Sequence, residues 1–100
     1  MIRYIELLKI NELYEGHNRT EQLEEIADLI KSVLDATEGI TGYKLDYKAT
    51  LDPMDADLYL EVDFENRDAL EEYDLSVEHL AASIKIAEHC QSILQYDLEV

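Results

Sequence analysis

The stretch that decides the fold is DLYLEVDFENRDALEEYDLSVEH, which runs from Asp57 to His79. Its first part alternates between apolar and mostly acidic side chains, and the apolar set is Leu58, Leu60, Val62 and Phe64. Because successive side chains of a strand point to opposite faces of a sheet, this alternation predicts a β-strand with one apolar face. One side of the sheet is therefore expected to cover a core.

Two short helices are predicted next, with a break between them at Ser76. Asn66 suits the N-cap of the first helix, residues 67–74, because its side-chain oxygen can accept a free backbone N–H. Ser76 suits the N-cap of the second helix, whose inner side is predicted to carry Leu80, Ala81, Ile84, Ala87 and Cys90. On one continuous helix, Tyr73 and His79 would lie about 120° apart around the axis. A restart at Ser76 allows the two side chains to converge.

The rest of the chain supplies one long helix and three more strands. A loop over Asn11–Arg19, which contains His17, is predicted to precede the helix. The helix is predicted to begin at Thr20 and to end at Gly39, with a buried stripe formed by Leu23, Ile26, Ala27, Ile30, Val33 and Leu34. Residues 52–55 are predicted to be a tight link between two strands. The three further strands are predicted at Ile2–Ile10, Tyr43–Leu51 and Ser92–Val100.

This order of elements, β-α-β-β-α-β, predicts a single α+β domain over residues 1–100 with a ferredoxin-like fold. Its four-stranded antiparallel sheet would have helices on one face only. The other face is predicted to carry Tyr59, a stripe of tyrosines and charged neighbours, and it would be open. A second copy of the chain could cover that face, so a homodimer is predicted.

Glu6 is the unusual residue of the first strand, because it shares the side of the sheet expected for Tyr4 and Leu8. A carboxylate among apolar side chains needs a partner, or it takes up a proton. The simplest interpretation places Glu6 near a sheet edge, in contact with water or paired with a lysine. A functional carboxylate is the alternative.

The net charge of −16, from 24 acidic and 8 basic residues, argues against two classes of partner. Nucleic acids and anionic membrane surfaces are both bound through clustered cations, so neither is expected. There is also no apolar run long enough to span a bilayer and no signal-peptide pattern at the N-terminus. The lone Cys90 fits a reducing compartment, so a cytoplasmic location is expected. The acidity itself is equally consistent with a salt-rich cell or with simple solubility.

No cofactor or metal is expected from the motifs. The pairs Glu78-His79 and Glu88-His89 do not have the spacing of a known metal site. The sequence contains neither a phosphate-binding glycine loop nor a nucleophile elbow. Cys90 has no cationic neighbour in sequence that would activate it, so it is predicted to be a small core residue.

Five short segments, spaced over nearly the whole chain, together resemble one protein family. They are Arg3-Tyr4-Ile5, Leu58 to Glu65, Leu70 with Tyr73, Glu78-His79-Leu80 and Tyr96-Asp97. In this order they resemble the stress-responsive dimeric α/β-barrel family, called Dabb. The resemblance implies a small homodimer in which two sheets pack face to face into a barrel with the helices outside. Most members have no known activity, and a few plant relatives are polyketide cyclases that use a His and a Tyr in a cavity between helices and sheet.

The catalytic pair of those relatives falls on His79 and Tyr73. The chain departs from the family at Tyr4, where a histidine is usual, and at Ser76-Val77, where a His-Pro pair is common. The resemblance implies that His79 acts as a base, since the helix N-terminus disfavours a charged imidazole, and that Tyr73 donates to a developing oxyanion. The residues expected to line the pocket are Tyr4, Glu6, Leu8 and Leu60. The structural alternative is that Tyr73 packs on the sheet and hydrogen-bonds His79, closing the helix junction.

Three functions remain open at this point. The first is a cytoplasmic homodimer with a small cavity, which binds a small apolar or aromatic ligand or serves a stress-related structural role without catalysis. The second is a cyclase or isomerase that acts on a polyketide-like or enolisable carbonyl compound. The third is an assembly module that forms particles larger than a dimer. Only the enzyme should lose turnover in His79→Ala.

Overall fold

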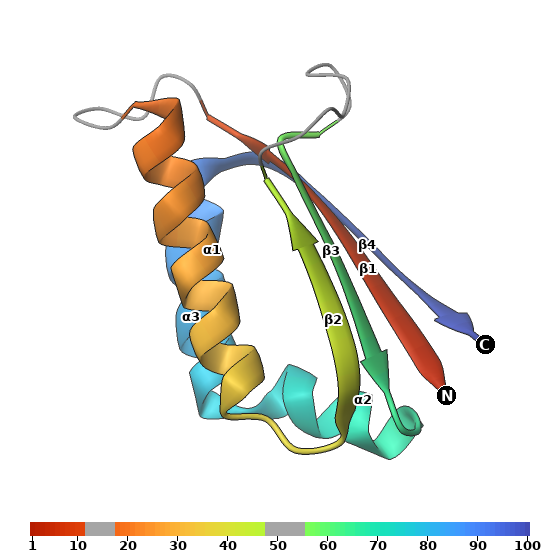
Figure 1. Cartoon of the computed structure of the whole chain (residues 1–100). Helices are drawn as coiled ribbons and strands as arrows, with labels where there is room; N and C mark the ends of the chain where they lie inside the picture. Colours follow the sequence, from red (N-terminus) through yellow and green to blue (C-terminus); the bar gives the residue numbers. More distant parts are fainter. Residues whose placement is uncertain (12–17, 48–55) are drawn as a thin grey trace.

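Four strands form one antiparallel sheet, and the helices are packed to one side of it (Figure 1). The computed structural model describes residues 1–11, 18–47 and 56–100. The elements follow the order β1 (Ile2–Ile10), α1 (Arg19–Asp35), β2 (Ile40–Asp46), β3 (Leu58–Phe64), α2 (Arg67–Leu75), α3 (Val77–His89) and β4 (Cys90–Glu99). This arrangement confirms the predicted α+β, ferredoxin-like fold. None of the helices so described is long and apolar enough to cross a membrane.

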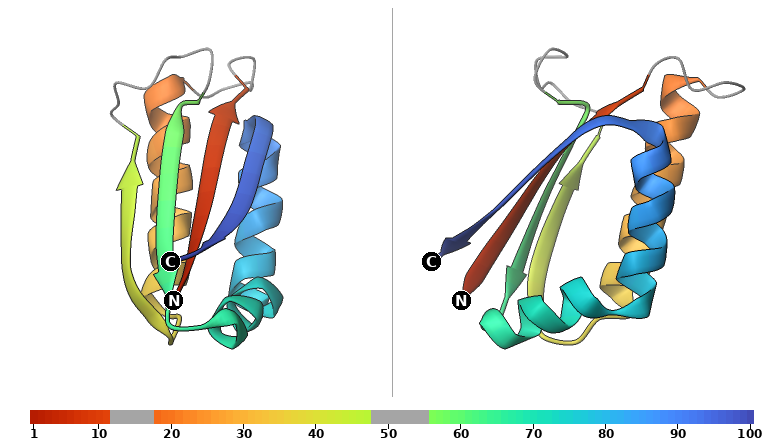
Figure 2. Two further views of the ribbon diagram at one scale, coloured as in Figure 1. Left: turned by 90° about the vertical axis from the view of Figure 1, so that its right-hand side faces the viewer. Right: turned by 180° about the vertical axis from the view of Figure 1, so that it is seen from behind.

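The strands lie in the order β2-β3-β1-β4, so β1 is a central strand and β4 is an edge strand (Figure 2). Glu6 of β1 lies opposite Leu60 of β3 on one side and opposite Gln95 of β4 on the other. Residues opposite one another in antiparallel strands share a face of the sheet. The register therefore places Glu6, Leu60 and Gln95 on one face, which is the face toward the helices.

The core lies between this face and the helices. The predicted alternation of β3 is confirmed, because its apolar set of Leu58, Leu60, Val62 and Phe64 is at most 1% exposed. The predicted stripe of α1 is buried as well. Both elements thus bury the faces that their sequence periods indicate.

The helix starts are set by local caps. Asn66 and Ser76 cap α2 and α3 as predicted, and each side chain accepts a backbone N–H three residues later. The prediction that the long helix begins at Thr20 is wrong by one residue. Asn18 is the N-cap, and its side-chain oxygen accepts the Glu21 N–H at 2.8 Å. The helix therefore begins at Arg19.

Two strands begin earlier than predicted. β2 begins at Ile40 rather than Tyr43, because Gly39 adopts a φ of 83° and turns the chain directly into the strand. A Cβ at this position would lie 2.7 Å from the Cβ of Ala69, so the close approach to α2 also requires glycine. β4 begins at Cys90 rather than Ser92, because the backbone is already extended at Cys90, directly after the last residue of α3. The predictions for His17, for residues 48–51 of the second strand and for the link at 52–55 lie outside the described residues.

The predicted inner side of α3 is wrong. Leu80 is 50% exposed and Ile84 is 67% exposed, while Ala82, Ile86 and His89 are buried. Ala81 and Ala87 are exposed too, and Cys90 is only partly buried. The start at Ser76 and the packing of α3 against α1 turn the stripe of Ala82, Ile86 and His89 toward the core. The larger apolar side chains therefore point to the opposite side of the helix.

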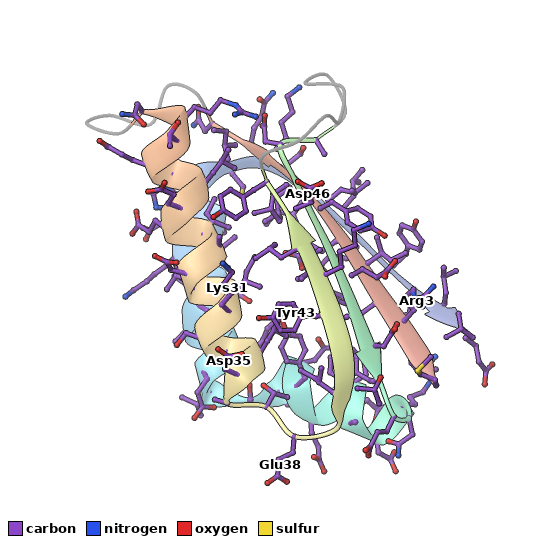
Figure 3. The ribbon with its side chains drawn as sticks, in the orientation of Figure 1. Arg3, Lys31, Asp35, Glu38, Tyr43 and Asp46 are labelled. Carbon is purple, nitrogen blue, oxygen red and sulfur yellow. The ribbon has the colours of Figure 1, made fainter. Side chains whose placement is uncertain are left out.

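The open face of the sheet is mixed in character. Arg3 lies on this face and pairs with Asp63 at 2.8 Å (Figure 3). The hydrogen bond from Arg3 holds the pKa of the Asp63 carboxyl below its usual range. The predicted tyrosine stripe reduces to Tyr59 and Tyr96, because Tyr43 lies opposite the core residue Val62 and so belongs to the helix side.

The two ends of the described chain lie beside each other. β1 begins where β4 ends, and the Val100 N–H donates to the Met1 carbonyl at 3.0 Å. Figures 1 and 2 show both termini at the same corner of the sheet.

Candidate functional site

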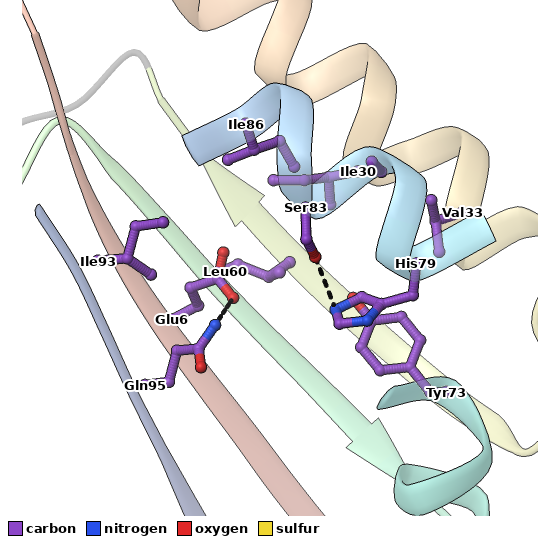
Figure 4. Close-up of a pocket in the computed structure, with 11 residues that line it drawn as sticks. Glu6, Ile30, Val33, Leu60, Tyr73, His79, Ser83, Ile86, Ile93 and Gln95 are labelled. Atoms are coloured by element: carbon purple, nitrogen blue, oxygen red, sulfur yellow. Dashed lines mark hydrogen bonds between the residues drawn. The ribbon is translucent and has the colours of Figure 1, made fainter. Parts of the chain in front are cut away.

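A cavity of about 60 Å³ lies between the helix-side face of the sheet and the helices (Figure 4). Six apolar side chains form most of its wall, namely Ile30, Val33, Leu60, Ala82, Ile86 and Ile93. Five polar side chains also line it, namely Glu6, Tyr73, His79, Ser83 and Gln95. The polar groups come from β1, β4, α2 and α3, so only the folded chain brings them together.

The junction of α2 and α3 brings Tyr73 and His79 together. The Ser76 hydroxyl donates to the Tyr73 carbonyl at 3.0 Å and accepts the His79 N–H at 3.1 Å. The chain changes direction at this point, and the two ring centroids lie 4.3 Å apart with 47° between the ring planes. The predicted break thus produces the predicted convergence.

The hydrogen bonds of His79 fix which ring nitrogen carries the proton in the neutral ring. Nδ1 lies 3.2 Å from the carbonyl oxygen of Asp74, which can only accept, so Nδ1 is the donor. Nε2 is then the acceptor, and the Ser83 hydroxyl lies 3.4 Å from it. The half-buried imidazole therefore offers the lone pair of Nε2 on the side of the cavity.

Tyr73 supplies a neutral hydroxyl. Its side chain is 4% exposed, and burial, together with the charges of Glu6 and Asp74, raises the pKa of the phenol far above its usual value. Among the described residues this hydroxyl has no hydrogen-bond partner, although every sealed side-chain nitrogen and oxygen in that part of the chain has one. The hydroxyl therefore borders the cavity. Its contact with His79 is between rings, not the hydrogen bond of the structural alternative.

Glu6 is buried in the middle of the sheet, 7% exposed. The interpretation that it lies near a sheet edge is wrong because β1 is a central strand, and Tyr4 and Gln95, not a lysine, donate to it. Its Oε2 accepts two hydrogen bonds, one from the Tyr4 hydroxyl and one from Gln95 Nε2 at 3.0 Å. Its Oε1 has no such partner among the described residues, and it faces the cavity (Figure 4).

The other two predicted pocket residues lie behind the wall of the cavity. Tyr4 is 5% exposed, and its ring packs edge-on against Tyr73 with centroids 6.3 Å apart. Burial and the adjacent Glu6 carboxylate raise the pKa of Tyr4, so its hydroxyl remains a donor to Glu6. Leu8 is completely buried in the core. Of the predicted pocket residues, Glu6 and Leu60 line the cavity and Tyr4 and Leu8 support it.

Two polar cavity residues, Ser83 and Gln95, were not predicted from the sequence as site residues. Ser83 carried a usable signal, because a residue four positions after His79 lies on the same side of a helix. Gln95 carried no local signal. Its position depends on the pairing of β1 with β4, which joins residues 89 positions apart.

A second polar cluster lies at the other end of α3, around His89. This residue is 3% exposed; its Nδ1 lies 3.3 Å from Gln22 Oε1 and its Nε2 lies 3.2 Å from Glu25 Oε2. Nearby, burial raises the pKa of the Cys90 thiol to about 11. Within residues 1–11, 18–47 and 56–100, no group of three or more His, Cys, Asp or Glu side chains could hold a metal ion.

Comparison with known proteins gives one family and several similar structures. The family model described as stress responsive A/B barrel domain, Dabb, matches residues 2–100. A protein from Arabidopsis thaliana has a TM-score of 0.81 at 14% identity, over 100% of this chain and 95% of that chain. A dimeric ferredoxin-like protein of unknown function from Thermobifida fusca has a TM-score of 0.81 at 19% identity, over 99% and 90%. Hydroxynitrile lyase from Passiflora edulis has a TM-score of 0.79 at 12% identity, over 99% and 92%.

At these identities the structural likeness shows the fold alone. No curated protein sequence matches the chain.

Proposed function

Because the chain belongs to the stress-responsive A/B barrel domain (Dabb) family, we propose that it is a homodimeric small-molecule-binding protein whose ligand site is the cavity between the sheet and the helices. One observation carries the proposal. The Tyr73 hydroxyl and Glu6 Oε1 both belong to buried side chains, both border the cavity, and neither has a protein partner among the described residues. Buried polar atoms are nearly always hydrogen-bonded, so a ligand or water must satisfy these two.

The size of the cavity limits the ligand. About 60 Å³ accommodates a few water molecules or a compound of a few heavy atoms, whereas sites for drug-sized ligands measure roughly 300–1,000 Å³. We therefore propose a small ligand with one apolar part, which would pack on Leu60 and Ile86, and one polar part near Tyr73.

The open face of the sheet supports the homodimer. Leu94, Tyr96 and Leu98 of β4 lie on this face with exposed fractions of 59%, 50% and 43%. The Thermobifida fusca protein is described as dimeric, and so is a ferredoxin-like protein from Bacteroides fragilis. A stable interface buries roughly 800 Å² on each partner, which a whole sheet face can supply. We propose the cytoplasm as the location, in keeping with the single cysteine.

The dimer can be tested with a matched pair of variants, Tyr96→Asp and Leu80→Asp. Both residues are 50% exposed, but Tyr96 lies on the open sheet face and Leu80 lies on the outer side of α3. Light scattering after size-exclusion chromatography at micromolar concentration should show a dimer for the wild type and Leu80→Asp, and a monomer for Tyr96→Asp. A monomeric wild type contradicts the proposal, and a larger particle favours the assembly module.

Ligand binding can be tested by NMR titration with neutral two- and three-carbon alcohols and ketones. Binding should shift the ring signals of Tyr73 and His79 and the side-chain amide of Gln95. Tyr73→Phe removes only the cavity hydroxyl, so it should weaken binding of a ketone by about 5- to 30-fold, the value of one lost hydrogen bond of about 1–2 kcal/mol. If no compound of this size shifts these signals, the cavity is not a ligand site.

One observation also favours an enzyme as the second candidate. His79 Nε2 is an acceptor and the Tyr73 hydroxyl is a donor, and both border one cavity. This pair could remove a proton next to a carbonyl group while donating to the carbonyl oxygen. A lyase from Passiflora edulis has a similar fold, which agrees with a catalytic use of this architecture. The cavity is too small for a polyketide, so the substrate proposed for an enzyme is a small enolisable carbonyl compound.

The two candidates differ in their response to His79→Ala. For an enzyme, exchange of the α-protons of hydroxyacetone with deuterated water should be accelerated by the wild type and should fall at least 100-fold in the variant. For a binding protein, the wild type should give no acceleration over buffer, and the variant should still bind the ketone.

A further inference from the structure

Glu6 gives the cavity a carboxylate that no lysine or arginine among the described lining residues pairs with. From this we infer that the ligand is a small organic cation, a primary ammonium compound, with the Glu6 carboxylate as its counter-ion. The inference deepens the proposed function and rests on the cavity being a ligand site.

The partners of Glu6 within the described residues carry no positive charge. Both groups that donate to it, the Tyr4 hydroxyl and the Gln95 amide, are neutral, and both bind Oε2. They satisfy one oxygen by hydrogen bonds but bring no positive charge. A buried carboxylate that keeps its charge normally requires a cationic partner or a metal. Oε1, which faces the cavity, is the atom at which such a partner can bind (Figure 4).

The lysines and arginines that the structure describes do not supply a positive charge to the wall of the cavity. Among the described residues that line the cavity there is no lysine or arginine. Arg3 pairs with Asp63 on the other face of the sheet, Arg19 pairs with Asp57, and Lys31 lies over the ring of Tyr47. The lysines and arginines that the structure describes thus do not line the cavity, which leaves room for a cationic ligand beside Glu6.

Further carboxylates contribute to the electrostatic potential around the cavity. Burial and the charges of Glu6 and Asp74 raise the pKa of the Tyr73 phenol, and burial together with the charge of Asp97 raises the pKa of Asp74. Together with the net charge of −16, these carboxylates give the cavity a negative electrostatic potential, which repels anions and attracts cations. A ligand with a carboxylate or phosphate group is thus disfavoured.

The hydrogen-bond acceptors of the cavity match the donors of a primary ammonium group. A primary ammonium has three N–H donors. Glu6 Oε1, the oxygen of Tyr73 and the oxygen of Ser83 can each accept one, and all three residues line the cavity. The apolar wall at Leu60 and Ile86 suits a short alkyl group. An ammonium compound of about three heavy atoms fits a cavity of this size.

The test is an NMR titration of the wild type with ethylammonium chloride, ethanol and sodium acetate at constant ionic strength. The three probes share a two-carbon skeleton and differ in charge. Ethylammonium should bind about tenfold more tightly than ethanol, because hydrogen bonds to a charged acceptor from a charged donor are roughly twice as strong as neutral ones. Acetate should produce no shift at Tyr73, His79 or Gln95.

Two variants test the role of the carboxylate. Glu6→Gln keeps the shape and the bonds from Tyr4 and Gln95 but removes the charge, so ethylammonium should lose its advantage over ethanol. Glu61→Gln is the control, because Glu61 lies on the adjacent strand but on the open face. It removes the same charge from the protein and should leave the tenfold preference within a factor of two.

Equal affinity for ethylammonium and ethanol in the wild type overturns the inference and leaves the ligand site intact. An equal loss of preference in both variants also overturns it, because the effect is then the net charge alone. If none of the probes binds, the proposed function and the inference both fail. The wild-type series decides the question even if Glu6→Gln does not fold.

Discussion

The two histidines at opposite ends of α3 have opposite surroundings. His89, the last residue of the helix, is 3% exposed and lies between Gln22 and Glu25 of α1. His79, the third residue, is half-buried, and its ring nitrogens are bonded to the Asp74 carbonyl and to Ser83. The partners of His89 thus belong to a distant helix, whereas those of His79 are five residues away or fewer.

This difference separates a structural histidine from one that is available to a ligand. The ring nitrogens of His89 both face side chains of α1, so the residue ties the two helices together. The ring of His79 is held in place by its own neighbourhood and still borders a cavity. Depth of burial alone is a poor guide to function. The partners on each ring nitrogen are more informative.

The largest expected effect is the loss of stability in His89→Ala. The substitution leaves a void and removes the partner of Oε1 of the fully buried Gln22, so the free energy of unfolding should fall by about 2–4 kcal/mol. His79→Ala, at the half-buried end, should lower it by about 1 kcal/mol or less. Urea denaturation of both variants measures the difference. Equal losses would remove the distinction between the two ends of the helix.

The next effect contrasts two buried tyrosines, Tyr4 and Tyr73, whose rings pack against each other. Tyr4→Phe deprives the Glu6 carboxylate of a donor and should cost about 1.5–3 kcal/mol, as expected for a hydrogen bond to a charged group. Tyr73→Phe removes a hydroxyl with no partner among the described residues and should change stability by less than about 0.5 kcal/mol. The same denaturation experiment at pH 7 compares them. A costly Tyr73→Phe would mean that its hydroxyl supports the fold rather than facing a ligand.

Alkaline pH should lower the free energy of unfolding through the two buried phenols, Tyr4 and Tyr73. Burial raises the folded-state pKa of Tyr4 and Tyr73 above the unfolded value near 10, so their contribution is complete below pH 10 and is lost as the pH rises beyond it. Each tyrosine should then remove about 1.4 kcal/mol of stability per pH unit. Unfolding measured from pH 9 to 11 should show a shallower slope in Tyr4→Phe and Tyr73→Phe. An unchanged slope in both would contradict the burial of these phenols.

The smallest effect should come from Ser83→Ala. Its hydrogen bond to His79 Nε2 is long, at 3.4 Å, and water in the adjacent cavity can replace it, so the loss of stability should stay below about 0.5 kcal/mol. The ¹⁵N chemical shift of Nε2 should nevertheless change, because its donor changes. A large loss of stability would show that His79 depends on this bond in the way that His89 depends on Gln22.

The parts of this fold that the sequence predicts well are those with local causes. Asn66 and Ser76 act on backbone groups three residues away, and the alternation of Leu58 to Phe64 is a property of the strand itself. The convergence of Tyr73 and His79 follows from one of these caps. It could therefore be predicted without knowledge of the remaining chain.

The parts that escaped prediction depend on contacts between distant segments. α3 has two apolar stripes, one with Leu80 and Ile84 and one with Ala82 and Ile86, and only the packing against α1 decides which is buried. The partners of Glu6 likewise depend on the register of β1 with β4. Contacts between distant segments decide which side of the helix is buried and how the strands pair. The sequence pattern of one segment alone therefore does not predict either.

The neighbouring ends of the chain have a mechanical consequence. Met1 and Val100 are hydrogen-bonded at one corner of the sheet, and the strands that leave this corner, β1 and β4, run antiparallel. A force applied between the two termini would therefore load the bonds of this ladder one after another rather than all at once. β4 would separate from β1 one hydrogen bond at a time, beginning at the Val100–Met1 bond, while the pairing of β1 with β3 would carry no load. Gln95 would leave Glu6 partway along this path, so tension on the ends would open the site before it unfolded the rest of the sheet.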